Sequence, residues 1–337
     1  MFEECLKKIL QGRDLTFNES EKSMDIIMSG DVSDIELASF LTALKLKGET
    51  ADEIGGCAVS MLRHASKISA FDKNLVDIVG TGGDGANTFN ISTTAAFVVA
   101  GAGVTVAKHG NVAVSSSSGS ADVLRELGIK IDLTPEKMED VLNSTNIAFL
   151  FAQKLHPAMK YAVPVRKTLK TRTIFNILGP LCNPANPKKM TIGVYSKELC
   201  FILAEAAKRI GKEHVLVVHG EDGLDEITTT RETAVCELRN GSISEYSISP
   251  EQFGMKIANF ADIAGGGPAE NAEILIDILT GKNSGSKRDI VILNAASAIL
   301  TSGKADKWED AISLANLAID SGQAFAKLNE LKKVTNC

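Results

Sequence analysis

Four glycines stand within six residues of the sequence, in Gly80-Thr81-Gly82-Gly83-Asp84-Gly85. Glycine lets backbone N–H groups come close to a ligand, and the N-terminus of a following helix favours an anion. A simple tight turn also uses glycine, but seldom four of them. The run therefore predicts a phosphate-binding loop.

Two further polar segments could take part in phosphate binding. Asn90-Ile91-Ser92-Thr93-Thr94 clusters small hydroxyl groups at an expected helix start, where one such residue alone would be a cap. Lys108-His109-Gly110-Asn111 leads through serines at 115–118 to another expected helix. A cation at the end of a strand, followed by hydroxyl groups, suits a polyphosphate, although a surface linker has the same composition. If both segments leave a parallel sheet at its carboxyl edge, they share a crevice with the glycine loop.

Basic and acidic side chains complete the candidate groups. His156, Arg166 and Arg172 lie close together in the sequence, and an arginine can bind a carboxylate with two hydrogen bonds. A solvated basic helix face is the competing interpretation. The stretch from His219 to Glu226 carries four acids between glycines, which predicts either a Mg²⁺ site or an exposed acidic turn. The whole set favours group transfer from a pyrophosphorylated substrate.

The glycine run also matches the dinucleotide-binding pattern GxGxxG. That pattern expects an acid about 20 residues later, at the end of the second strand. Lys108 and His109 stand there instead. NAD binding is therefore disfavoured, while NADP binding stays open.

The elements expected to hold these groups begin with a helical region over residues 1–68. Apolar residues at 2, 5, 6, 9 and 10 lie on one helix face. Three capping boxes follow, at Thr16 to Glu19, Ser33 to Glu36 and Thr50 to Glu53. Gly30 and Gly48 stand where helix C-caps are expected.

From residue 75 the pattern changes to strands that alternate with helices, which predicts a mostly parallel sheet. Strands are expected at 75–79, 104–107, 190–195 and 215–218, helices at 87–101, 121–127 and 199–210, a loop at 171–188, and a hairpin at 233–248 around Asn240-Gly241. The rest is expected to be mainly helical.

The composition limits the classes of function. The chain has 337 residues with 36 basic and 42 acidic side chains, a net charge of −6, and no basic stripe, so nucleic-acid binding is not expected. No apolar run approaches the length of about 18 residues that marks a membrane helix. The start of the chain is acidic where a signal peptide is basic. Six scattered cysteines form no CxxC pair. We expect a cytoplasmic enzyme with no membrane contact.

The motifs together resemble those of the anthranilate phosphoribosyltransferases. The matching segments, in family order, are GTGGDG at 80–85, NIST at 90–93, KHGN at 108–111, SGSADVL at 118–124, HPAMK at 156–160, VRKTL at 165–169, RTIFNILGPLCNP at 172–184 and HGEDGLDE at 219–226. The resemblance implies a small helical domain (1–68, joined by about 166–188) and a larger α/β domain (72–165 and 189–337), as in pyrimidine nucleoside phosphorylases. It also implies a homodimer formed through the helical domain.

The resemblance further implies the site residues. Phosphoribosyl pyrophosphate (PRPP) is expected at Gly80, Gly82, Gly83, Asp84, Thr88, Asn90, Ile91, Ser92, Thr93, Lys108, Ser116 and Ser120. Mg²⁺ is expected at Ser92, Asp225 and Glu226. Anthranilate is expected at Gly80, His109, Asn111, His156, Arg166, Gly179 and Pro180. Lys108, Arg166 and Asn111 are the expected catalytic residues.

One position departs from the family pattern: Val112 stands where these enzymes commonly have arginine after KHGN. We expect the change to weaken PRPP binding without abolishing activity. The competing hypotheses are a pyrimidine nucleoside phosphorylase of the same fold, a nucleic-acid-binding relative without activity, and an NADP oxidoreductase.

Overall fold

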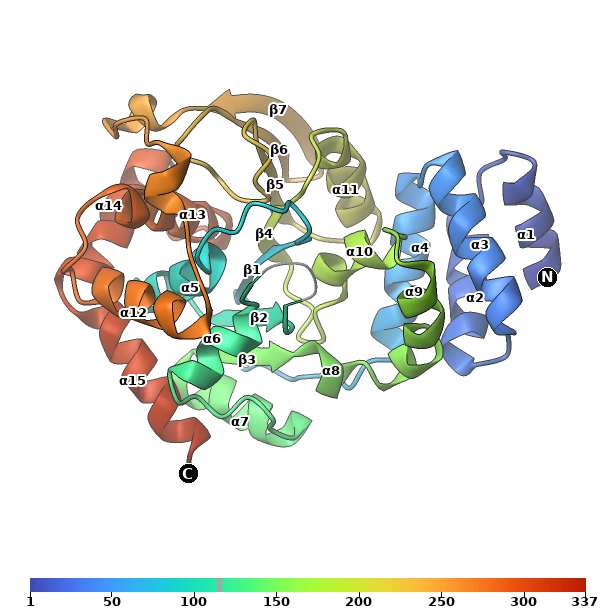
Figure 1. The fold of residues 1–337 in the computed structure, drawn as a ribbon, viewed down its shortest axis with the longest axis horizontal. Coiled ribbons are helices and arrows are strands. Elements are labelled where there is room, and N and C mark those ends of the chain that lie inside the picture. The colour runs from blue at the N-terminus through green and yellow to red at the C-terminus, as the bar shows by residue number, and fades with distance from the viewer. Residues whose placement is uncertain (114–116) are drawn as a thin grey trace.

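The computed structural model describes residues 1–113 and 117–337. A small N-terminal helical bundle lies beside a larger part that is built on one sheet (Figure 1). The bundle consists of α1 (Phe2–Leu10), α2 (Phe17–Ser29), α3 (Asp34–Lys47) and α4 (Ala51–Arg63). The predicted fold class, a helical domain plus an α/β domain with a mostly parallel sheet, is confirmed.

The seven-stranded sheet has the order β3-β2-β1-β4-β5-β6-β7. The five strands from β3 to β5 are parallel, whereas β6 and β7 form an antiparallel hairpin at one edge. The strands are β1 (Val76–Gly80), β2 (Val106–Gly110), β3 (Ile147–Phe151), β4 (Lys189–Gly193), β5 (His214–Gly220), β6 (Thr233–Arg239) and β7 (Ser242–Ile248). The hairpin turns at Asn240 and Gly241, both with positive φ, as the sequence predicts.

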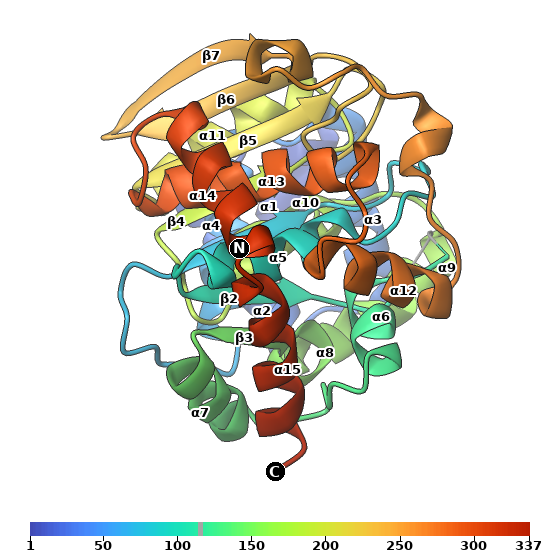
Figure 2. The ribbon, with the colours of Figure 1, turned by 90° about the vertical axis from the view of Figure 1, so that its left-hand side faces the viewer.

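Helices cover both faces of the sheet, and β5 shows why. Val215 and Val217 belong to a core shared with the bundle, whereas Leu216 and Val218 belong to the core on the opposite face. This alternation is the period of two expected for a strand that is buried on both sides. In Figure 2, α13 (Ser286–Ser302), α14 (Trp308–Asp320) and α15 (Gln323–Thr335) lie in front of the sheet and the bundle lies behind it.

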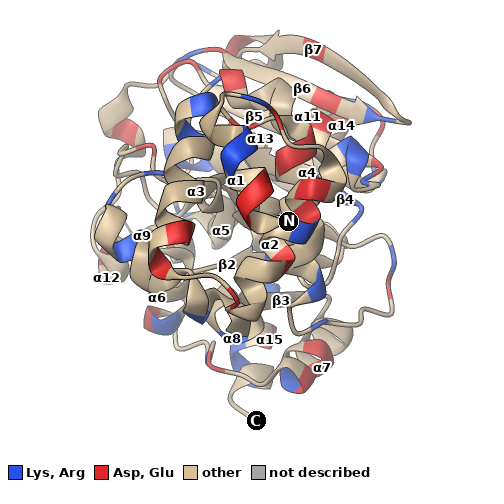
Figure 3. Ribbon diagram, turned by 90° about the vertical axis from the view of Figure 1, so that its right-hand side faces the viewer, with Lys and Arg blue, Asp and Glu red and all other residues tan. Residues whose placement is uncertain are grey.

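The remaining helices are α5 (Ile91–Gly101), α6 (Ser120–Glu126), α7 (Pro135–Thr145), α8 (Ala152–Leu155), α9 (Val163–Leu169), α10 (Phe175–Leu178), α11 (Glu198–Arg209) and α12 (Pro268–Leu279), with short 3₁₀ turns η1 (Pro157–Tyr161), η2 (Gly179–Cys182), η3 (Pro250–Phe253) and η4 (Phe260–Ile263). Among these helices, α5 and α11 pack directly against strands of the sheet. Within the described residues, no helix is both long and apolar enough to cross a membrane. Basic and acidic residues are intermixed on the face that carries the bundle (Figure 3).

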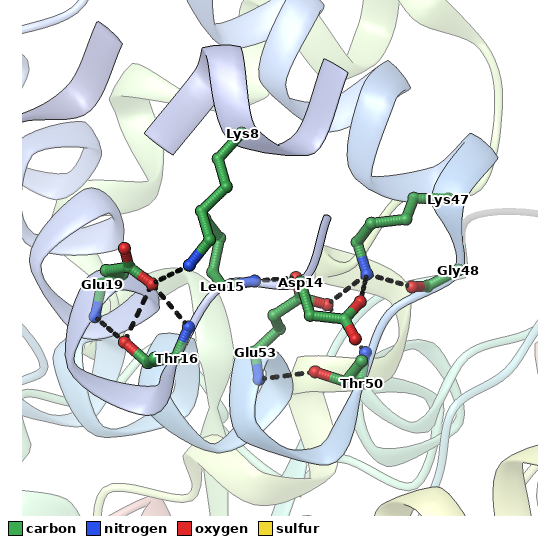
Figure 4. Close-up of polar contacts among 9 residues, drawn as sticks. All are labelled: Lys8, Asp14, Leu15, Thr16, Glu19, Lys47, Gly48, Thr50 and Glu53. Atoms are coloured by element: carbon green, nitrogen blue, oxygen red, sulfur yellow. Dashed lines mark hydrogen bonds and ion pairs between the residues drawn. The ribbon is translucent and has the colours of Figure 1, made fainter. Parts of the chain in front are cut away.

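All three predicted capping boxes of the bundle are present. The box at Thr50 does more than cap the start of α4 (Figure 4). The Glu53 carboxylate is fully buried and accepts hydrogen bonds from the backbone N–H of Leu15 at 2.9 Å and from Lys47 Nζ at 2.9 Å. It therefore joins the α1–α2 loop to α4, and its charge is paired, as burial requires.

Three expectations about local structure are wrong. The helix expected from Asn87 begins at Ile91, because residues 87–90 continue the preceding loop. The strand expected at 104–107 begins at Val106 and continues through Lys108 and His109. The segment 171–188, expected as a loop, contains α10 and η2.

Candidate active site

The candidate residues gather where the parallel strands end. Gly80 ends β1, Gly110 ends β2 and Gly193 ends β4, and Gly80 pairs directly with Gly193. The carboxyl ends of parallel strands lie on one edge of a sheet, where ligands of open α/β folds bind. The glycine loop, the KHGN segment and the acidic loop leave the sheet at this edge.

The conformation of the glycine loop explains its composition. Gly82, Gly83 and Gly85 have φ of 68°, 79° and 73°, values that other residues rarely adopt. The Thr81 N–H donates to Gly193 O at 2.9 Å, which ties the loop to β4. The Asp84 carboxylate accepts from Ala86 N within the loop.

The acidic loop lies directly against the glycine loop. Asp225 Oδ2 accepts from Gly82 N at 2.6 Å. A Cβ atom at Gly80 would overlap the Asp225 carboxylate, and one at Gly193 would overlap the Asp225 backbone. Glycine at the ends of β1 and β4 is therefore a condition for bringing the two loops together.

The paired acids are less exposed than expected. Asp225 is only 9% exposed, and Glu226 is half-buried, so the interpretation as an exposed acidic turn is wrong. Burial raises the pKa of Asp225, and the neighbouring carboxylates Glu226 and Asp84 raise it further. Burial also raises the pKa of Glu226, to about 7. Such a set of crowded carboxylates is suited to bind a cation.

The acids alone do not form a complete metal site. In the described part of the chain, no three His, Cys, Asp or Glu side chains are grouped so that they could hold a metal ion. Mg²⁺ usually takes one or two carboxylates and completes its shell with water and substrate phosphates. Asp225 and Glu226, with the nearby Ser92, fit that donor set.

Lys108 lies deep in the site, at 4% exposure. Its Nζ donates to Ile78 O at 2.7 Å and to Ser92 Oγ at 3.3 Å. Ser92 N in turn donates to Glu226 Oε1 at 3.2 Å, so Ser92 connects the cation to the acidic loop. Burial lowers the pKa of Lys108, and the carboxylate of Asp77 opposes that shift.

The hydroxyl-bearing segments also meet. Thr93 Oγ1 donates to Ser120 Oγ at 3.1 Å, and Asn90 Nδ2 donates to Ser118 O at 3.1 Å. The Ile91 side chain is buried, which leaves only its backbone for a ligand. Thr88 forms an isolated bridge with Ala264. Ser116 lies outside the described residues.

The two histidines form a buried pair beside this site. His109 Nε2 and His156 Nε2 are 3.2 Å apart, and His109 Nδ1 is 3.2 Å from Gly179 O. Gly179 and Pro180 begin η2, so the predicted anthranilate residues of this segment adjoin His109. Asn111 follows β2 directly, and its Oδ1 accepts from Gln153 Nε2 at 3.1 Å.

The two arginines have different surroundings. Arg166 projects from α9 over the ring of Phe175, with 5.3 Å between Cζ and the ring centroid. Burial lowers its pKa, so the solvated basic face does not describe Arg166. Arg172 instead lies over the Tyr195 ring at 3.9 Å and donates from Nη2 to Gly83 O. It therefore contacts the glycine loop.

Several buried polar residues that are not among the predicted ones support the site. Asp77 accepts from His109 N at 3.2 Å and from Asn183 Nδ2 at 2.8 Å. Asn294 on α13 accepts from Ile227 N at 3.0 Å and donates to Ile227 O at 2.8 Å, next to Glu226. Asp77 stands inside a run of apolar residues, and this is the one signal that could have identified it.

Comparison with known proteins relates the whole chain to one family. The glycosyl transferase family, a/b domain, matches residues 72–325, and the helical bundle domain of the same family matches residues 3–65. The anthranilate phosphoribosyltransferase of Methanobrevibacter smithii is 48% identical over 336 residues, which is 100% of both chains.

Two solved structures are similar over nearly their full length. The anthranilate phosphoribosyltransferase of Thermus thermophilus superimposes with a TM-score of 0.94 at 39% identity, covering 98% of this chain and 99% of that one. The enzyme from Saccharomyces cerevisiae, in complex with PRPP and Mg, gives a TM-score of 0.90 at 31% identity and covers 99% and 98%.

Proposed function

The chain belongs to the anthranilate phosphoribosyltransferase family, and we propose that it joins anthranilate to the phosphoribosyl group of PRPP. The bond from ribose C1 to the pyrophosphate oxygen breaks, and a bond from C1 to the anthranilate nitrogen forms. The amine loses a proton, and pyrophosphate leaves. The product is N-(5-phosphoribosyl)anthranilate, an intermediate of tryptophan biosynthesis.

One observation carries the assignment: a buried lysine, a glycine loop and paired acids converge at one sheet edge. Ser92 joins Lys108 to Glu226, and Asp225 joins the acidic loop to the glycine loop. Negative charge develops on the departing pyrophosphate, and fixed donors aimed at that charge lower the barrier. Lys108 and the amides of the glycine loop supply such donors. The PRPP residues are proposed to be Gly80, Gly82, Gly83, Asp84, Thr88, Asn90, Ile91, Ser92, Thr93, Lys108, Ser116 and Ser120.

Mg²⁺ is the proposed cofactor, held by Ser92, Asp225 and Glu226. When bound, it neutralises charge on the pyrophosphate. The raised pKa values of the two acids support this role, because a cation relieves the repulsion among buried carboxylates.

Anthranilate is proposed to bind beside Gly80, His109, Asn111, His156, Arg166, Gly179 and Pro180. Arg166 would hold its carboxylate and Asn111 would orient the amine. The amine is already a neutral nucleophile, so orientation contributes more than a strong base. The buried histidine pair, with pKa values lowered to about 3 and about 4, supports an uncharged wall for the aromatic ring.

We also propose the domain division given above, a homodimer formed through the bundle, and a cytoplasmic location. Exposed apolar side chains on the bundle support the dimer: Leu10, Ile35 and Leu46 are 64%, 80% and 82% exposed. Such side chains are expected at an interface between subunits.

Product analysis tests the function. The purified chain is incubated with PRPP, anthranilate and Mg²⁺, and released pyrophosphate is compared with anthranilate consumed. We expect a ratio of one to one. Cleavage of uridine with inorganic phosphate, and no pyrophosphate release, would instead indicate a nucleoside phosphorylase.

A further inference from the structure

A segment from the C-terminal third of the chain lies against the proposed phosphate loops. It runs from Ala264 into the first turn of α12 and is orange in Figure 1. Ala264 forms the bridge with Thr88, and Gly265 N donates to Asn87 O at 3.0 Å. A Cβ atom at Gly265 would overlap the backbone of Phe89. The approach is thus closer than any residue with a side chain allows.

Asn271 fixes this contact from the inside. Its side chain is 1% exposed. Oδ1 accepts from Gly266 N at 2.8 Å, and Nδ2 donates to Asn90 Oδ1 at 3.1 Å. The Asn271 carboxamide therefore binds its own loop through its oxygen and the residue before α5 through its nitrogen. Because a backbone N–H can only donate, the oxygen must face Gly266, and this fixes the orientation of the amide.

Asn90 in turn binds Ser118. Its Oδ1 also accepts from Ser118 Oγ at 3.3 Å, while its Nδ2 donates to Ser118 O. A separate bond joins the same segments, because Ser117 Oγ donates to Gly266 O at 2.9 Å. Three segments that are far apart in the sequence, 87–90, 117–118 and 264–271, are thus held by one network.

We propose that Asn271 is a positioning residue for the PRPP site. It sets the orientation of Asn90 and, through Asn90, the spacing between the start of α5 and Ser118. The proposal rests on the proposed function, which assigns Asn90, Thr93 and Ser120 to PRPP. Donors that are fixed before the ligand arrives bind it with a smaller ordering cost, so loss of Asn271 should weaken PRPP binding selectively.

Two substitutions separate the effect of the Asn271 hydrogen bonds from the effect of its side-chain packing. Asn271→Ala removes both hydrogen bonds, whereas Asn271→Asp keeps the acceptor for Gly266 N and places a carboxylate oxygen against Asn90 Oδ1. We expect each to raise the KM for PRPP about tenfold, the size expected when a buried partner is left unpaired. The KM for anthranilate should change less than twofold. Asn316→Ala on α14 is the matched control, since that amide also accepts a hydrogen bond, from Arg288 Nη2, and donates one, to Ile312 O.

A double-mutant cycle tests the route through Asn90. In an Asn90→Ala background, Asn271→Ala should change the KM for PRPP less than twofold. A full tenfold effect in that background, an equal rise in both KM values, or an unchanged KM in the single variants would overturn the proposal. If Asn271→Ala does not fold, Asn271→Asp, which keeps the bond from Gly266 N, takes its place, and an unchanged KM for PRPP in that variant contradicts the proposal.

Binding is also measured without turnover, as the thermal shift that PRPP with Mg²⁺ produces. An inactive wild-type chain that PRPP still stabilises overturns the proposed function alone, and smaller shifts in the Asn271 variants then support the positioning role. A wild-type chain with no shift overturns both. An active wild-type chain whose Asn271 variants show the full shift overturns only the positioning role.

Discussion

His109 on β2 and His156 after α8 face each other through their Nε2 atoms, 3.2 Å apart, inside the protein. Burial lowers the pKa of His109 to about 3 and that of His156 to about 4. The pair is therefore uncharged at neutral pH. Each ring would take up a proton near its usual pKa of 6.5 only once the chain unfolds.

Because the pKa values of both histidines are lowered in the folded protein, we expect acid to destabilise it. Below about pH 6.5 the unfolded chain binds protons that the folded pair does not bind. The contribution of the pair to stability is therefore full above that pH and is lost as the pH falls from about 6.5 toward 3. His156→Gln should reduce the loss of unfolding free energy between pH 7 and pH 5 by about 2 kcal/mol. Thermal melts of both proteins across this range measure it. Parallel pH curves would show that His156 titrates normally in the fold.

We expect that removing the charges of Asp225 and Glu226 stabilises the ligand-free protein and reduces its activity. Asp225→Asn with Glu226→Gln keeps the size of both side chains and removes their charge. Because the pKa of each carboxyl is raised, the charged forms are disfavoured in the fold, and the ligand-free double variant should melt at a higher temperature. Turnover should fall at least about a hundredfold, because charge stabilisation of the leaving group is lost. Full activity would remove the acids from the metal site.

We expect substitution of Arg166 to affect the KM for one substrate, anthranilate. Arg166→Ala should raise the KM for anthranilate tenfold or more, since a charged hydrogen bond contributes about 1.5–3 kcal/mol. Arg166→Lys keeps the charge but not the planar guanidinium that donates two hydrogen bonds, so its KM for anthranilate should lie between those of the wild type and Arg166→Ala. Steady-state kinetics with each substrate varied in turn measure the split. A rise confined to the KM for PRPP would place Arg166 at the other substrate.

Substitutions at Val112 test whether the departure from the family pattern affects PRPP binding. It is half-buried, and its N–H donates to Asn111 Oδ1 at 2.8 Å. Val112→Arg should lower the KM for PRPP by a factor that corresponds to about 1 kcal/mol, and salt should reduce the gain. Val112→Gln, which is long but uncharged, is the control. An equal effect of both variants, or none at low salt, would show that the charge at 112 does not reach the phosphates.

Local patterns in the sequence are enough to predict much of the fold. The capping boxes at Thr16, Ser33 and Thr50 involve residues three apart, and the hairpin at Asn240-Gly241 is a two-residue turn, so neighbouring residues decide both. The start of α5 differs from the prediction because residues 87–90 are held by the segment at 264–271. Contacts over such distances leave no local pattern.

The candidate site likewise contains features that the sequence identifies and features that depend on contacts made only in the fold. Glycine runs, Lys108 and the paired acids can be identified from residue type and spacing. The burial of Asp225 could not be predicted, because it depends on β1 and β4 meeting at Gly80 and Gly193. Asp77, Asn271 and Asn294 act through backbone atoms that come close only in the fold.

The fluorescence of anthranilate provides the most direct test of the central claim. The purified chain is mixed with anthranilate, PRPP and Mg²⁺, and the decay of anthranilate fluorescence is followed while each component is omitted in turn. We expect a decay that requires the protein, anthranilate, PRPP and Mg²⁺. The double substitution Asp225→Asn with Glu226→Gln should nearly abolish it. Unchanged fluorescence in the complete mixture, or a decay that proceeds without PRPP, would contradict the central claim.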